Sequence, residues 1–145
     1  MLDEPSSGLD PVVRRDILGA IVRTVAYEGR TVFFSSHLLD EVERVADHVA
    51  MVVEGEVVLS DRLETVKTTH HRLVVRFDTP QDRVPVFDGA LSVHGTQREW
   101  TVLCNGDRAG VERAIATMHA RVLEEATPTL EEIFVAHASR RTSGF

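Results

Sequence analysis

Two adjacent carboxylates, Asp3 and Glu4, are the residues near the start of the chain best suited to hydrolytic chemistry. They follow the apolar residue Leu2 and precede Pro5, a pattern typical of a buried strand that ends in a turn. At such a strand tip one carboxylate can hold a divalent cation while its neighbour activates a water molecule. The plainer interpretation is an acidic turn that caps a helix, and the pair alone does not separate the two.

A helix is predicted directly after this acidic turn. Asp10 can accept hydrogen bonds from free backbone N–H groups, and Pro11 has the backbone angle of a first helical turn. Gly29 can end the helix in the left-handed conformation. The apolar side chains recur at helical spacing and predict a face that packs on a sheet: Val13, Ile17, Ile21 and Val25.

A second polar cluster, Ser35-Ser36-His37, ends the β-branched and aromatic run 31–35. That run predicts a strand covered on both faces. Strand, helix and strand in this order predict a parallel pair, whose carboxyl ends share one edge of the sheet. Asp3, Glu4 and His37 are therefore expected to lie close together. The alternative for His37 is a helix cap or an otherwise satisfied polar group.

The next segments alternate helix and hairpin signals. Residues 38–46 carry an apolar helical stripe, and runs 49–53 and 56–60 flank Glu54-Gly55, a two-residue hairpin turn. Asp61 is expected to cap a short helix that ends at Thr68.

A polar stretch without periodicity, residues 68–71, separates two differently patterned halves. We place a domain boundary there, giving domains 1–69 and 70–145. In the second domain, strands are predicted at 72–77, 90–94, 99–103 and 121–123. A helix is expected to open at Asp107, and a last helix to start with Pro128 at its first position. Ile133 and Phe134 on that helix are expected to pack in the core.

Composition limits the classes of function. The 145 residues carry a net charge of -7, so we exclude nucleic acid as a partner. The longest apolar runs are far shorter than the roughly 20 residues that cross a bilayer, and no secretory signal is seen. Cys104 is the one cysteine and is expected to be a small apolar strand residue. His70 and His71 are expected to be exposed, since adjacent side chains diverge too far for a metal site.

The first ten residues also resemble a known family. The run Leu2-Asp3-Glu4-Pro5-Ser6-Ser7-Gly8-Leu9-Asp10-Pro11 is similar to the Walker B motif and D-loop of ATP-binding-cassette (ABC) transporter ATPases. Ser35-Ser36-His37-Leu38-Leu39-Asp40-Glu41-Val42 resembles the H-loop of the same family. The resemblance implies an α/β fold: the second half of a P-loop nucleotide-binding domain with a parallel sheet, followed by a small α+β accessory domain.

This resemblance implies a role for each matching residue. Asp3 would hold the Mg²⁺ of Mg-ATP through a water, Glu4 would be the general base, and His37 would contact the γ-phosphate. The D-loop residues would lie at the interface with a second nucleotide-binding domain: Ser7, Gly8, Leu9 and Asp10. The cofactors implied are ATP and Mg²⁺. The partners implied are that second domain and a transmembrane permease, with the protein at the cytoplasmic face of the cell membrane.

The end of the chain resembles one particular branch of this family. Residues 127–134 look like the C-terminal ending of ATPases from the drug and polysaccharide exporter branch of the family, which implies an exporter. No Gly-x-x-x-x-Gly-Lys-Ser/Thr phosphate loop or Gly-rich signature occurs in the chain. We therefore expect a truncated or partial product that is inactive alone. The alternative is a non-catalytic remnant that acts as a regulatory or partner-binding module.

Overall fold

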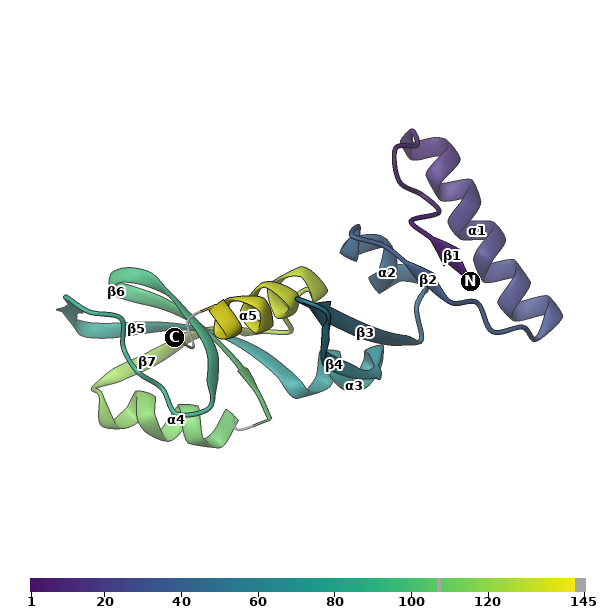
Figure 1. Cartoon of the computed structure of the whole chain (residues 1–145). Helices are drawn as coiled ribbons and strands as arrows, with labels where there is room; N and C mark the ends of the chain where they lie inside the picture. The colour runs from purple at the N-terminus through teal and green to yellow at the C-terminus, as the bar shows by residue number, and fades with distance from the viewer. Residues whose placement is uncertain (107, 143–145) are drawn as a thin grey trace. The chain divides into compact units, whose positions relative to one another are not determined.

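The computed structural model describes residues 1–106 and 108–142. They form two compact units, Met1–Asp47 and His48–Phe145. The elements follow one another in the order shown in Figure 1: β1 (Leu2–Asp3), α1 (Pro11–Glu28), β2 (Phe34–Ser35), α2 (Leu39–Val45), β3 (His48–Val53), β4 (Glu56–Arg62), α3 (Leu63–Thr69), β5 (His70–Gln81), β6 (Ala90–Asn105), α4 (Arg108–Thr117), β7 (Ala120–Ala126) and α5 (Leu130–Thr142).

The first unit is a strand–helix–strand arrangement, as predicted. β1 pairs in parallel with β2, and Asp3 stands opposite Ser35. Asp10 is the N-cap of α1, since its carboxylate accepts from the backbone N–H of Val12 at 2.9 Å and of Val13 at 3.2 Å. Gly29 ends the helix with φ of 61°. Local cap signals were therefore sufficient to predict both ends of this helix.

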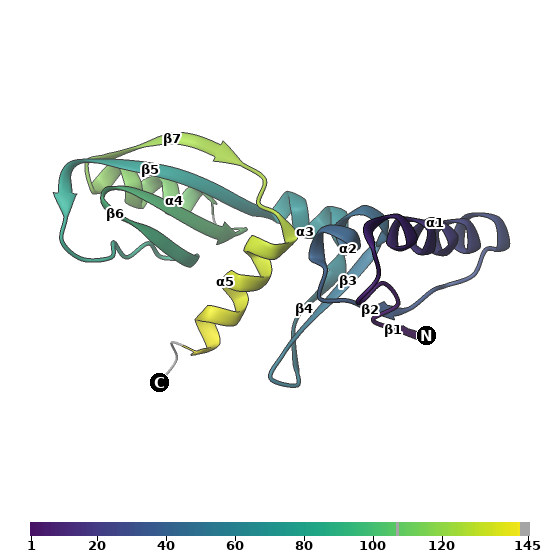
Figure 2. The ribbon, with the colours of Figure 1, turned by 90° about the horizontal axis from the view of Figure 1, so that it is seen from above.

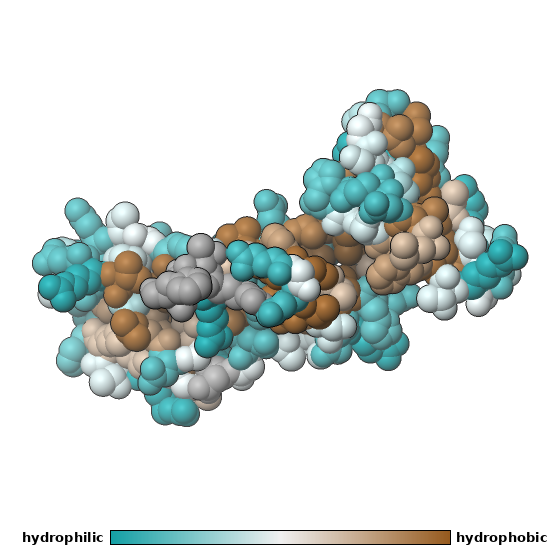
Figure 3. Space-filling model, in the orientation of Figure 1, coloured by the Kyte–Doolittle hydropathy of each residue, from teal (hydrophilic) through white to brown (hydrophobic). Residues whose placement is uncertain are grey.

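The apolar face of α1 differs from the prediction. Its buried residues are Leu18 and Ile21, whereas Val13 is 42% and Val25 38% exposed. Figure 3 shows apolar atoms at the surface along this helix. The two-stranded sheet of this unit is too small to cover the predicted stripe.

The second unit begins with the predicted hairpin. β3 and β4 pair antiparallel around Glu54 and Gly55, both of which have positive φ, of 51° and 80°. Two such residues suit a tight turn whose twist matches that of the strands. The prediction that Asp61 caps the next helix was wrong. Arg62 is the N-cap of α3, and Asp61 accepts only from the adjacent N–H of Arg62, at 2.7 Å.

The core of the second unit is an antiparallel sheet of order β6-β5-β7 between two helices. Figure 2 shows α4 along one face. The side chains on that face form one buried cluster: Leu73, Val75, Phe77, Phe87, Trp100, Val102, Cys104, Val111 and Ile115. Cys104 is thus the buried apolar strand residue expected. The other face, through Leu103, lines a cavity of about 240 Å³ together with Val135 of α5.

Two boundaries of the second unit differ from the prediction, and a third was not tested. Segments 90–94 and 99–103 belong to one strand, β6, which bends at Gly95 and Gln97. The helix start expected at Asp107 lies outside the described residues. Pro128 does not occupy the first position of α5, which begins at Leu130. Thr129 and Glu132 instead form a reciprocal capping box: Glu132 N–H donates to Thr129 Oγ1 at 3.2 Å, and Thr129 N–H donates to Glu132 Oε2 at 2.7 Å.

The boundary between the two compact units also differs from the predicted domain boundary. The sequence predicted a boundary between residues 69 and 70, where α3 in fact passes directly into β5. The units separate between Asp47 and His48, so the β3–β4 hairpin belongs with the second unit. Strands β2 and β3 lie in different sheets. No helix within residues 1–106 and 108–142 is long and apolar enough to cross a bilayer.

Candidate functional site

The acidic pair lies at the carboxyl end of β1, held there by β2. The N–H of Glu4 donates to the backbone oxygen of Ser35 at 3.2 Å and lies 3.0 Å from its Oγ. Glu4 has a φ of 46°, the left-handed region that residues other than glycine rarely adopt. The turn is completed by the N–H of Ser7, which donates to the oxygen of Glu4 at 3.1 Å. Strain of this kind persists only where surrounding contacts fix the backbone.

Ser35 is a site residue that the sequence analysis did not single out. Its hydroxyl donates a short hydrogen bond to Oδ1 of Asp3. The parallel register places the two residues directly opposite each other. That register follows from how the two strands pair, which the residue pattern of either strand alone does not specify.

His37 and Glu4 are in direct contact, although 33 positions separate them in sequence. His37 Nδ1 lies 2.8 Å from Glu4 Oε2. An ionised carboxylate only accepts hydrogen bonds, so Nδ1 of His37 donates in this contact, which does not engage Nε2. The His37 side chain is 65% exposed and that of Glu4 35%, which leaves both within reach of a ligand. Of the three residues predicted for the site, Glu4 and His37 are therefore in contact, and Asp3, next to Glu4 in sequence, contacts Ser35.

The helix-cap interpretation of these residues does not fit the geometry. Asp10, rather than Asp3 or Glu4, caps α1. The residue before α2 is Leu38, and its N–H is bonded by the hydroxyl of Ser36 at 3.0 Å, rather than by His37. Neither the acidic pair nor the histidine is thus used as a helix cap.

The predicted D-loop is a turn between β1 and α1. Gly8 has a φ of 72°, where a side chain would be strained. Ser7 and Gly8 are exposed and Leu9 is half-buried. The carboxylate of Asp10 is occupied by the cap of α1. Ser7 and Gly8 are therefore the members of this segment most open to a partner.

A metal could be held here by one carboxylate of the chain. Asp3 is exposed, which fits a contact made through water. Among the described residues no three His, Cys, Asp or Glu side chains surround a common position. Mg²⁺ takes most of its ligands from water and phosphate, so a single carboxylate is compatible with that ion.

The histidines at 70 and 71 form a separate polar region in the second unit. The expectation that both are exposed was wrong for His70, which is 1% exposed. Its Nδ1 lies 2.8 Å from the oxygen of Val66, and its Nε2 lies 3.3 Å from Nε2 of His137 on α5. Burial lowers the pKa of both His70 and His137. Adjacent residues in a strand face opposite ways, so helix α5 can cover one histidine only.

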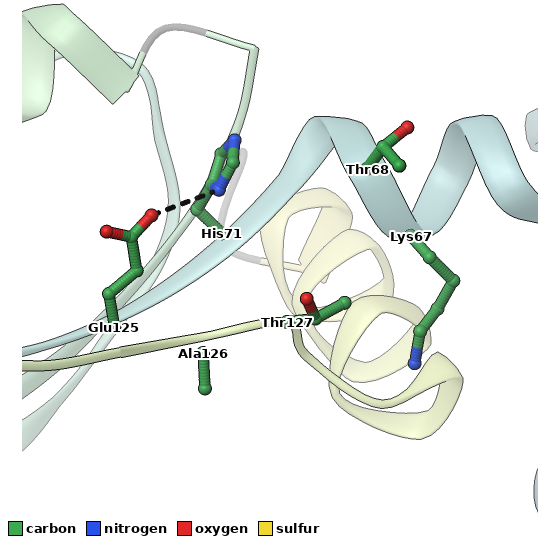
Figure 4. Close-up of a pocket in the computed structure, with 6 residues that line it drawn as sticks. All are labelled: Lys67, Thr68, His71, Glu125, Ala126 and Thr127. Carbon is green, nitrogen blue, oxygen red and sulfur yellow. Dashed lines mark ion pairs between the residues drawn. The ribbon is translucent and has the colours of Figure 1, made fainter.

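His71 lines an open pocket of about 420 Å³ (Figure 4). Its Nδ1 lies 3.5 Å from Glu125, and Glu125 also accepts from Arg108 at 2.8 Å. Lys67 points to the other side and donates to the oxygen of Pro128 at 2.8 Å. The charged groups of the pocket are therefore satisfied within the protein itself, and the pocket adds nothing to the chemistry of the acidic pair.

Comparison with known proteins gives the family. No protein-family model matches the chain. An ABC transporter ATP-binding protein of Synechocystis is 31% identical over 143 residues, 97% of this chain and 40% of that protein. The fluoroquinolones export ATP-binding protein of Mycobacterium tuberculosis is 29% identical over 97% of this chain and 43% of its own length. The ABC transporter ATP-binding protein YtrB of Bacillus subtilis is 25% identical over 94% of this chain and 47% of its own length.

These matches cover nearly all of this chain, which spans less than half the length of each relative. The predicted fold class, part of a P-loop nucleotide-binding domain followed by a small α+β module, is confirmed. The chain is a homologue of the ATP-binding proteins of ABC transporters.

Proposed function

We propose that the chain supplies the Walker B, D-loop and H-loop part of an ATP-hydrolysing ABC transporter subunit. The contact between Glu4 and His37, at 2.8 Å, is the observation that carries this proposal. It joins a potential general base to an imidazole that keeps one free nitrogen, at the edge where parallel strands end. Two exposed side chains from distant segments have no evident packing reason to meet there.

Each site residue then has a distinct task. Glu4 accepts a proton from the attacking water, and its contact with Nδ1 of His37 orients the carboxylate. With both ring nitrogens protonated, Nε2–H of His37 can donate a hydrogen bond to a phosphate oxygen. Asp3, fixed by the Ser35 hydroxyl, holds Mg²⁺ through water. When bound, Mg²⁺ neutralises charge on the phosphates.

The proposal includes partners that the first unit is suited to bind. Ser7 and Gly8 are exposed at the predicted D-loop, where a second nucleotide-binding domain would contact the chain. The exposed valines of α1 agree with a unit that other parts of a larger domain complete. A permease would then hold the subunit at the cytoplasmic face of the membrane.

Export is the proposed direction of transport. The relative from Mycobacterium tuberculosis is named for fluoroquinolone export and matches 97% of this chain. Residues 127–134, which resemble the ending of exporter ATPases, form the capped start of α5. Transport by membrane vesicles that carry the assembled protein tests the direction: cargo accumulated against the proposed direction would contradict it.

Hydrolysis by the full-length polypeptide that contains this chain tests the site. Glu4→Gln should lower turnover by a factor on the order of 10²–10⁴ while ATP binding persists, because the amide keeps the shape but does not accept a proton. Glu28→Gln, an exposed glutamate at the end of α1, is the matched control. Unchanged turnover in Glu4→Gln would remove this residue from the role.

The chain by itself should bind Mg-ATP weakly and hydrolyse none. Affinity for nucleotide phosphates comes chiefly from the backbone N–H groups and lysine of a phosphate loop, which the sequence lacks. Calorimetric titration of the chain with Mg-ATP checks this expectation. Micromolar binding would contradict it.

A second candidate function rests on the part of the second unit from residue 70 onward. It has its own buried cluster on the α4 face of the sheet, so it can serve as a regulatory or partner-binding module. If deletion of residues 70–145 from the full-length polypeptide leaves both hydrolysis and its regulation unchanged, this candidate has no support.

A further inference from the structure

We propose that Glu41 and Arg14 are positioning residues that hold Glu4 against His37. This inference rests on the proposed function and assigns it two further residues. Glu41 lies in the first turn of α2, four positions after His37, and is 3% exposed. Arg14 lies in the first turn of α1. A buried carboxylate this close to an exposed site needs a reason, because burying a charge is costly unless it is paired.

Both oxygens of the Glu41 carboxylate have a partner. Oε2 accepts from the hydroxyl of Ser6 at 2.7 Å, and Ser6 is 1% exposed. Oε1 forms an ion pair with Nε of Arg14 at 3.1 Å, a charge contact without hydrogen-bond geometry. Nη2 of the same arginine donates to the backbone oxygen of Leu9 at 3.1 Å. One carboxylate and one guanidinium therefore fix the turn after Glu4 at two points, Ser6 and Leu9.

These contacts join the two chain segments that carry the site. Ser6 is two residues from Glu4, and Glu41 begins the helix that follows His37. On the other side of the site, backbone pairing of Glu4 with Ser35 joins the same two segments. The Glu4–His37 contact lies between these two links. An exposed hydrogen bond is weak when its side chains are free to move, so such links raise the fraction of molecules in which it forms.

A merely structural role is distinguishable from this one. Apolar residues would hold α2 on α1 without the cost of a buried charge, whereas the Glu41 carboxylate connects α2 to both Ser6 and Arg14. If Glu41 acts by holding Glu4 against His37, its substitution should lower kcat only while the Glu4–His37 contact is intact. If Glu41 only stabilises the first unit, the effect of its substitution on kcat should combine independently with that of a substitution at His37.

The first test is a double-mutant cycle in the full-length polypeptide. Glu41→Gln keeps the shape and removes the charge that Arg14 needs. We expect kcat to fall by at least ~10-fold and KM for Mg-ATP to change by less than ~3-fold. In a His37→Ala background the same change should cost less than ~2-fold, because the contact is already lost. Asp40→Asn, on the same helix but largely exposed, is the matched control and should leave kcat unchanged.

The second test does not depend on hydrolysis. In ¹⁵N histidine NMR of the same polypeptide, His37 should appear as the tautomer protonated at Nδ1, as its contact with Glu4 requires. Glu41→Gln should shift it toward the tautomer mixture of a free imidazole, as Glu4→Gln does, while Asp40→Asn should not. Losses of kcat that multiply fully in the double mutant, or a His37 signal that Glu41→Gln leaves unchanged, would overturn the proposal. If the full-length polypeptide does not hydrolyse ATP but Glu41→Gln still shifts the His37 signal, the result counts against the proposed function and leaves the positioning role in place.

Discussion

The two units of this protein differ in the contacts that stabilise each of them internally. The second unit has nine residues in one buried apolar cluster. Among the described residues of the first unit, the buried apolar side chains are Leu18 and Ile21, and the other buried side chains are Ser6 and Glu41. The candidate site is therefore in the unit with the smaller apolar core, where polar contacts and a strained backbone set the geometry. Rigidity of the site must come from those contacts or from a partner.

The largest expected effect of this difference is on hydrogen exchange. Amides of β5, the central strand, should exchange only when the second unit opens globally, whereas amides in the middle of α1 should exchange through local opening. If the second unit has a stability of about 5 kcal/mol, the protection of Val75 should exceed that of Ala20 by a factor on the order of 10³. Native-state exchange followed by NMR measures both. Equal protection would show that the two units unfold together.

Core truncations should show the same contrast. Leu73→Ala removes a fully buried side chain of the large cluster and should destabilise the second unit by about 2–5 kcal/mol. Ile21→Ala in the first unit should cost less than about 2 kcal/mol, because its surroundings can collapse or admit water. The chain has one tryptophan, Trp100, in the second unit, so its fluorescence reports urea unfolding of that unit. A large shift of this transition in Ile21→Ala would contradict the separation.

Acid should weaken the second unit through its buried histidines. Burial is the main cause that holds the pKa of His70 and His137 below the ordinary value of 6.5, and electrostatic interactions with His71 for His70, and with His70 and Arg140 for His137, lower it further. Below about pH 6.5 the unfolded chain therefore binds more protons than the folded one, and stability falls as the pH falls. Above that pH the pair is neutral in both states and contributes no pH dependence.

The free energy of unfolding should fall by at most about 1.4 kcal/mol per pH unit for each of these two histidines. Urea midpoints of Trp100 fluorescence between pH 7.5 and 5.5 measure it. His137→Gln should flatten the dependence, and His94→Gln, an exposed histidine on β6, should retain it. A steeper dependence in His137→Gln would show that other groups are responsible.

Sequence predicted the parts of this fold that depend on local signals. Both ends of α1 and the hairpin at Glu54-Gly55 were predicted from a few adjacent residues. The capping box of α5 was also readable, since Thr129 and Glu132 have the required spacing, but Pro128 was given more weight. Asp61 was misassigned as a cap because its side chain is used by the next residue. Several acidic residues near a helix start leave the choice of cap to local geometry.

The candidate site divides in the same way. Asp3, Glu4 and His37 could be predicted because their types follow a strand end and match a family motif. Ser35 and the buried Glu41 could not, because their importance comes from pairing across more than 30 positions. The burial of His70 depends on α5, which lies 60 residues later in the chain and contributes His137. Contacts of this kind require the tertiary structure.

The smallest expected effect compares one helix cap in each unit. Thr129→Ala removes the capping box of α5, and Asp10→Ala removes the N-cap of α1; each should cost about 1 kcal/mol. α5 packs on the sheet through Leu130 and Ile133, which are fully buried, so the loss of Thr129 should shift the Trp100 transition by that amount. α1 has only two buried apolar residues, so the loss of Asp10 should reduce helical circular dichroism and leave the Trp100 transition in place. A matched shift in Asp10→Ala would mean that the stability of α1 is linked to the core of the second unit.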